Sequence, residues 1–119
     1  MQTIRNLTPH EIAVYDRSGE HVIIRFPPGR PARVTEVRKA AESIADLPVS
    51  EVRYGGVSGL PAPEVGVWLI VSQIVLSCER SRRVDLISPD TADGAVRDTS
   101  GRIVGTTGFV RFPPQSDPR

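Results

Sequence analysis

The longest apolar stretch of the chain, residues 66–80, holds the only Trp and the only Cys and is the segment around which a core would form. Its β-branched and aromatic side chains over residues 67–71 predict a buried strand. Ser72 then predicts the N-cap of a short helix over residues 73–79, because its hydroxyl can accept a hydrogen bond from an unpaired backbone N–H. Apolar residues also alternate as far as Cys78, so one long strand remains the alternative.

Shorter alternating segments predict further strands. Residues 11–15 and 21–26 flank an Asp-Arg-Ser-Gly sequence at 16–19, which is typical of a turn closing a β-hairpin. A second hairpin is expected around the similar turn at residues 98–101. The other expected strands lie at residues 1–7, 34–37, 49–54, 84–87 and 109–112.

The segments around the strand at residues 49–54 are harder to interpret. Residues 38–46 contain Ala, Glu and Lys and are ambiguous between two helical turns and irregular structure. The pair Gly55-Gly56 is expected to close the strand, because glycine weakens a ladder. Residues 57–63, with two prolines, are expected to form a loop leading to the central apolar stretch.

The core is expected to form around Trp68 and Ile70 of the central strand, with three side chains of the strand at residues 21–26 packed nearby: Val22, Ile24 and Phe26. On the helix, one face would carry Ile74, Val75 and Cys78. These expectations follow from periodicities of two for strands and 3.6 for helices.

Together these elements predict a mainly β fold, either a small single-domain barrel or a bent antiparallel sheet, with one short helix. A length of 119 residues fits one domain, which we expect to span residues 1–112, followed by a disordered tail at 113–119. Short strands interrupted by Gly and Pro leave exposed sheet edges, which natural proteins cover or pair. We therefore expect a homo-oligomer.

The charge balance limits the partners that the chain attracts through bulk electrostatics. Fifteen basic residues face fourteen acidic ones, for a net charge of +1, so there is no strong signal for nucleic acid or an anionic membrane. A single Cys excludes an internal disulfide framework and a Cys-rich zinc site. No long apolar run suggests a membrane span or leader, and a cytoplasmic location is the expectation.

No residue pattern indicates catalysis, a metal or a cofactor. Ser72 and Cys78 lack the glycine-flanked setting of a nucleophile elbow and are better explained as a helix cap and a small apolar side chain. His10 lies in a polar turn beside Glu11 that either forms a small site or bonds its own backbone. We therefore expect a protein that is not an enzyme.

The remaining candidate chemistry is arginine on loops. All basic residues except Lys39 are Arg, whose planar guanidinium suits phosphate, although a GC-rich genome produces the same bias. Backbone next to glycines and an aromatic ring complete a plausible site for a small phosphorylated or nucleotide-like ligand. The residues expected to form it are Arg83, Arg97, Tyr54, Gly55, Arg33 and His10. The alternative is a solvated surface.

Four segments resemble a family of small, uncharacterised proteins of phages, prophages and actinobacteria. They are the opening Asn-Leu-Thr-Pro-His at residues 6–10, Tyr-Gly-Gly-Val-Ser-Gly-Leu-Pro at 54–61, the Val-Ser junction at 71–72 and Val-Arg-Asp-x-x-Gly-Arg-Ile-Val-Gly at 96–105. By analogy with other small β-rich phage proteins, the resemblance suggests an anti-defence sponge that sequesters a nucleotide-like immune signal. A structural or protein-interaction module is the alternative function.

Overall fold

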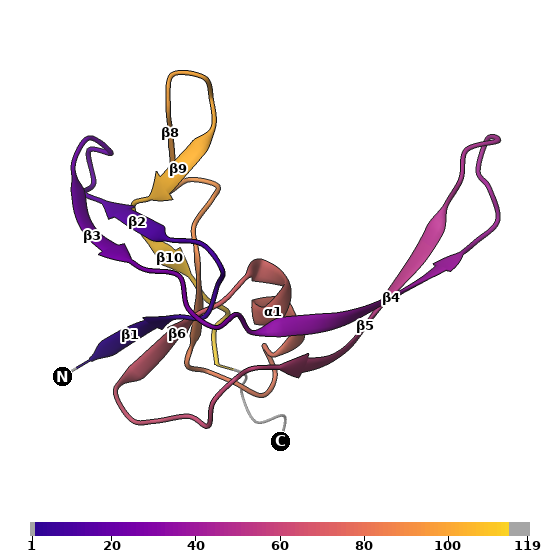
Figure 1. The fold of residues 1–119 in the computed structure, drawn as a ribbon, viewed down its shortest axis with the longest axis horizontal. Helices are drawn as coiled ribbons and strands as arrows, with labels where there is room; N and C mark the ends of the chain where they lie inside the picture. Colours follow the sequence, from indigo (N-terminus) through magenta and orange to yellow (C-terminus); the bar gives the residue numbers. More distant parts are fainter. Residues whose placement is uncertain (1, 115–119) are drawn as a thin grey trace.

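A computed structural model describes residues 2–114 and shows a small body from which one long β-hairpin projects (Figure 1). The elements follow one another as β1 (Thr3–Asn6), β2 (Ile12–Tyr15), β3 (Val22–Phe26), β4 (Arg33–Ala40), β5 (Ser50–Ser58), β6 (Val67–Ile70), α1 (Gln73–Cys78), β7 (Leu86–Pro89), β8 (Ala95–Arg97), β9 (Ile103–Thr106) and β10 (Phe109–Val110).

The first sheet has the strand order β1-β6-β7-β10 and contains the centre of the core. Strand β6 pairs in parallel with both β1 and β7, and β10 is antiparallel to β7. Because β6 has a partner on each side, Leu69, Ile70 and the following Val71 are at most 1% exposed. The central apolar stretch therefore forms the core, as its composition predicts.

Helix α1 begins directly after this strand, and the prediction of a strand followed by a helix is confirmed. The Ser72 hydroxyl accepts a hydrogen bond from the Val75 backbone N–H at 3.3 Å, which is the expected N-cap. The buried face differs from the prediction, since Val75 and Leu76 are buried whereas Ile74 is 46% exposed. Ile74 instead faces the base of the projecting hairpin.

The prediction that Trp68 lies at the centre of the core is wrong. Its side chain is only partly buried, and the Arg111 guanidinium lies 5.4 Å from the centre of its ring. The predicted neighbours are also displaced from the centre: Ile24 is 47% exposed, and Val22 and Phe26 are partly buried. The core cluster consists of Ala32, Leu69, Val71, Val75, Leu76 and Leu86.

The second sheet has the order β3-β2-β9-β8 and contains both predicted hairpins. Strands β2 and β3 pair around the first turn and β8 and β9 around the second, while β2 and β9 meet in parallel. Thr106 ends β9 and is 1% exposed. Its hydroxyl lies 2.8 Å from the Asp90 carbonyl and 2.6 Å from that of Gly108, so it ties the end of this sheet to the start of β10.

The third sheet is the hairpin of β4 and β5, which we call the arm (residues 33–58). Its strands pair from Arg33 and Ser58 to Ala40 and Ser50, so part of the segment left ambiguous at 38–46 is strand rather than helix. Gly55-Gly56 does not end β5, contrary to the prediction. A Cβ at Gly55 would lie 3.3 Å from the Thr35 side chain, so glycine lets the two strands continue side by side.

The mainly β fold with one short helix is confirmed. No sheet closes into a barrel within residues 2–114, and the pairing is mixed rather than purely antiparallel. The disordered tail expected at residues 113–119 lies largely outside the described residues.

Candidate interaction arm and the groove at its base

The arm carries apolar side chains into solvent. All residues of β4 from Thr35 onward and all of β5 as far as Gly56 are exposed. Apolar side chains that are normally buried are 39–66% exposed here; they are Val37, Ile44, Leu47, Val52 and Tyr54. Figure 1 shows the arm curving away from the other strands, with α1 close to its base. The chain thus presents a long ribbon with two uncovered faces.

The strand register assigns the side chains to these two faces. Val37 lies opposite Arg53 and Lys39 opposite Glu51, so these four side chains share one face. Glu36 opposite Tyr54 and Arg38 opposite Val52 define the other face. Each face therefore mixes apolar and charged groups, a composition typical of a protein surface and not of a core.

A tight turn closes the tip of the arm. Ile44 and Leu47 exchange backbone hydrogen bonds of 2.9 and 3.0 Å, and Ala45 and Asp46 between them have φ values of 50° and 62°. Positive φ at both central positions is the geometry of a type I′ hairpin turn. Ala rarely adopts this conformation, which costs roughly 1–2 kcal/mol. The strained turn holds Ile44 and Leu47, both about two thirds exposed, at the end of the arm.

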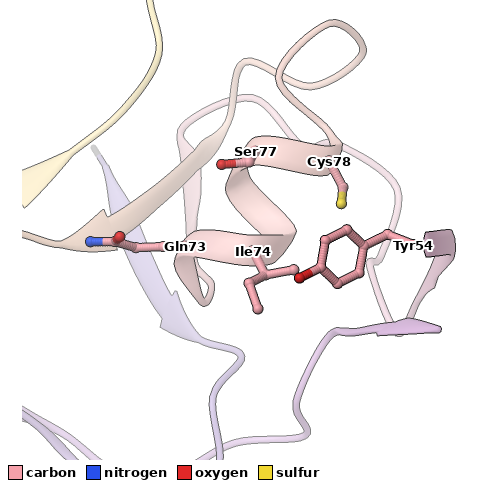
Figure 2. A pocket seen from close by; sticks show the side chains of 5 residues that line it. All are labelled: Tyr54, Gln73, Ile74, Ser77 and Cys78. Atoms are coloured by element: carbon pink, nitrogen blue, oxygen red, sulfur yellow. The ribbon is translucent and has the colours of Figure 1, made fainter. Parts of the chain in front are cut away.

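A groove lies where the arm meets α1. Figure 2 shows the Tyr54 ring beside Ile74 and Cys78, and these residues with Gln73 and Ser77 line a hollow of about 390 Å³. An adjoining hollow of about 220 Å³ lies between Tyr54 and Ile74 on one side and the start of β4 on the other. Its charged side chains are Arg33 and Glu36.

The structure brings together some of the predicted ligand residues. Arg33 and Tyr54 line the same hollow, and Gly55 follows Tyr54 on β5. Arg83, Arg97 and His10 lie on other elements and line neither of the two hollows at the base of the arm.

The Arg83 side chain forms hydrogen bonds with other groups of the same chain. Its guanidinium donates two hydrogen bonds to the Asp85 carboxylate, at 2.9 and 2.8 Å, and a third to the Pro61 carbonyl at 3.0 Å. Both side chains of the pair are 13% exposed. The hydrogen bonds from Arg83 to Asp85 raise the pKa of Arg83 above its ordinary value. This arrangement fixes the loop before β6 to the segment before β7.

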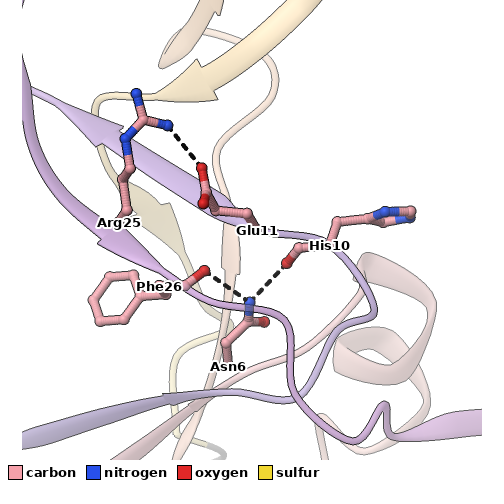
Figure 3. Close-up of polar contacts among 5 residues, drawn as sticks. All are labelled: Asn6, His10, Glu11, Arg25 and Phe26. Carbon is pink, nitrogen blue, oxygen red and sulfur yellow. Dashed lines mark hydrogen bonds and ion pairs between the residues drawn. The ribbon is translucent and has the colours of Figure 1, made fainter.

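Arg97 and His10 have similarly local surroundings. Arg97 donates a 2.7 Å hydrogen bond to the Gly101 carbonyl across the turn between β8 and β9. His10 contributes its backbone carbonyl, which accepts a 2.8 Å hydrogen bond from the Asn6 amide, while its exposed ring points away from this cluster (Figure 3).

The motif Asn-Leu-Thr-Pro-His forms a buried polar clamp around Asn6, which is 8% exposed. The Asn6 amide also donates to the Pro27 carbonyl at 3.0 Å, and its oxygen accepts from the Thr8 N–H and hydroxyl at 3.0 and 2.7 Å. The Gly29 backbone lies so close to the Asn6 backbone that a Cβ atom at position 29 would be 1.9 Å from the Asn6 carbonyl oxygen. The clamp positions the segment that leads into the arm.

Comparison with known proteins adds no functional assignment: no family model, curated protein or solved structure matches the chain. Within residues 2–114 no helix has the length and apolar character needed to cross a membrane. The same residues contain no group of three or more His, Cys, Asp or Glu side chains placed to hold a metal ion.

The sequence-based site missed the apolar residues of the arm. The relevant signal is the alternation of Val with charged residues over 36–38 and 51–53, which overlaps the strands predicted at 34–37 and 49–54 and does not indicate what covers them. Only the structure shows that neither face of this strand pair is covered by the described chain.

Proposed function

We propose that this chain is a non-enzymatic protein-interaction module and that the arm is its contact surface. The observation that carries this proposal is the exposure of the five apolar side chains Val37, Ile44, Leu47, Val52 and Tyr54 on an element that reaches away from the body. An isolated two-stranded hairpin is marginally stable in water. An arm of this length therefore gains most from a partner that covers it.

The overall dimensions support the same function. The radius of gyration is 17.0 Å, against about 13.5 Å for a compact domain of this length. The arm contributes little to the core cluster, which draws on β6, α1 and β7 and on Ala32 just before β4. Its residues are thus available for contact without disturbing the fold.

Site-specific photo-crosslinking in the cells that naturally produce the protein tests this function. A benzophenone-bearing phenylalanine replaces Val37 or Val52 on the arm, and in matched controls it replaces Val65 or Val84, which are exposed outside the arm. We expect crosslinked protein adducts from both arm positions and none from the controls. Absence of adducts from the arm, or equal adducts from all four positions, would contradict the proposed function.

A second candidate function is binding of a small phosphorylated or nucleotide-like ligand, the class that an anti-defence sponge would take. Its support is the shared hollow of Arg33 and Tyr54 at the base of the arm. Thermal-shift measurements with cyclic dinucleotides and ADP-ribose derivatives test it. A stabilising ligand whose effect disappears in Arg33→Ala and persists in Arg30→Ala would support this function, and no shift with any of these nucleotides would count against it.

A further inference from the structure

The outer edge of β5 is available for strand pairing. Strand β5 pairs with β4 along one edge, and no other strand in residues 2–114 pairs with it. An open edge presents a row of unpaired N–H and C=O groups, which is a template for adding a strand from another chain. Residues 50–56 along this edge are exposed.

The side chains along this edge are complementary to themselves. Strand β5 contains the sequence Glu51-Val52-Arg53. If two such strands pair antiparallel about a two-fold axis at Val52, each Glu51 lies opposite Arg53 of the second copy. Oppositely charged cross-strand pairs stabilise a sheet, and like charges destabilise it. The symmetry creates this attraction twice.

The same tripeptide occurs on β4 as Glu36-Val37-Arg38, and the two copies differ in one decisive respect. On β4 the acid and the base already form an ion pair with each other. On β5, neither Glu51 nor Arg53 forms an ion pair within the described residues. Arg53 is therefore left for a partner, and Glu51, which lies opposite Lys39 without forming an ion pair with it, can also bind one.

Pairing at this edge also covers apolar surface. Val52 and Tyr54 lie on the same face of the arm and are 39% and 51% exposed. The two-fold axis places the two Val52 side chains next to each other and each Tyr54 across from Ser50 of the second copy. Because the arms run antiparallel, the tip of each approaches the base of the other.

We propose that the partner of the arm is a second copy of this chain, bound through antiparallel pairing of the two β5 strands about Val52. This inference rests on the proposed interaction function and names its partner. It converts two marginal two-stranded ribbons into one four-stranded sheet, and a sheet needs three or more strands with a hydrophobic face to be independently stable.

The exposed area of the chain is large enough for such a dimer. The accessible surface is 8790 Å², whereas a compact monomer of 13.0 kDa exposes about 6,300 Å². This excess of about 2,400 Å² for the whole chain is larger than the roughly 800 Å² that each partner buries in a standard interface.

Charge reversal tests this arrangement on the purified chain. Sedimentation velocity across micromolar concentrations should show a wild-type dimer. Glu51→Arg and Arg53→Glu should each raise the dissociation constant of the dimer about tenfold or more, because two attractions become two repulsions. A mixture of the two variants should form a heterodimer, since each Arg then faces a Glu.

The mixture separates lost pairing from damage to the arm. Glu51→Arg places a second positive charge opposite Lys39, yet a disrupted arm would not regain affinity when the other variant is added. Arg17→Glu and Glu20→Arg, at exposed positions before β3, are the charge controls and should leave the dimer unchanged.

The outcomes also separate this inference from the proposed function. A wild-type monomer at all concentrations, a dimer insensitive to both reversals, or a mixture that stays monomeric would overturn pairing through β5. If arm crosslinks in cells then join the chain to a protein of another mass, the interaction function stands without self-pairing. If the arm forms no crosslink at all, both fail.

Discussion

The position of the core is tested by comparing two adjacent residues, Leu69 and Trp68. Leu69 is 1% exposed and belongs to the core cluster between α1 and β7, so Leu69→Ala leaves a cavity in a region with no solvent access. Such substitutions cost about 2–5 kcal/mol of unfolding free energy. Trp68 is only partly buried and its ring contacts Arg111, so we expect about 1–2 kcal/mol for Trp68→Ala.

Urea denaturation followed by circular dichroism measures both changes without depending on Trp fluorescence. For a slope of about 1–3 kcal/mol per M of urea, Leu69→Ala lowers the midpoint by about 1–3 M when the loss is about 3 kcal/mol. The unfolding free energy of a chain of this size is about 5–15 kcal/mol, so the loss in Leu69→Ala is a large fraction of the total stability. A larger loss for Trp68→Ala than for Leu69→Ala would refute the assignment of the core.

Three further predictions concern the arm, the ion pair of Arg83 with Asp85, and the turn at residues 98–101. Replacing residues 37–53 by Asn-Gly should leave the unfolding free energy within about 1 kcal/mol of the full chain and abolish dimer formation in sedimentation, because the arm lies outside the core. Arg83→Ala should lower the unfolding free energy by about 1–3 kcal/mol in urea denaturation, because it leaves Asp85 largely buried without its partner. The Ser100 hydroxyl, and then the Arg102 N–H, hold the pKa of Asp98 below 3.8. The hydrogen bonds to the ionised Asp98 carboxylate therefore stabilise the turn fully at pH values above 3.8. This stabilisation is lost as the pH falls through the folded-state pKa of Asp98. The Ser100 amide resonance should therefore move only under strongly acidic conditions.

Local structure was predictable where the interactions that form it are local. In both predicted hairpins the Asp side chain bonds within its own turn: Asp16 accepts from the Ser18 hydroxyl at 2.6 Å and Asp98 from the Ser100 hydroxyl at 2.8 Å. Ser72 caps α1 through the same kind of contact. Such bonds form between residues two or three positions apart, so the residue types alone indicate them.

The core depended on pairings between distant segments, and these were not predictable from periodicity. Strand β6 becomes the inner strand because residues near the N-terminus pair on one side and β7 on the other. Double-sided burial favours the end of the strand, Leu69 to Val71, over Trp68. A single Trp in an apolar segment indicates that a core is nearby, and it does not show which neighbour occupies the centre.

The ligand site illustrates a different difficulty, which is that arginine binds several kinds of acceptor. The donor geometry that suits phosphate also suits a carboxylate or a backbone carbonyl. Arg83 uses it for Asp85 and Pro61, and Arg97 for Gly101. Residue type therefore indicates that these side chains donate hydrogen bonds, whereas the identity of their acceptors depends on the fold.

The arm shows why the same pattern can indicate either a core or an interface. Alternation of Val with Glu and Arg gives a strand one apolar face. It does not indicate whether that face packs against the same chain or against another chain. Within this chain, α1 reaches only the base of the arm. Val37 and Val52 remain exposed beyond it. If Glu51 and Arg53 pair across a two-fold axis as proposed, the second copy lies beside Val52 and supplies the partners of both charges, so the alternation on β5 describes an interface between copies and not a core.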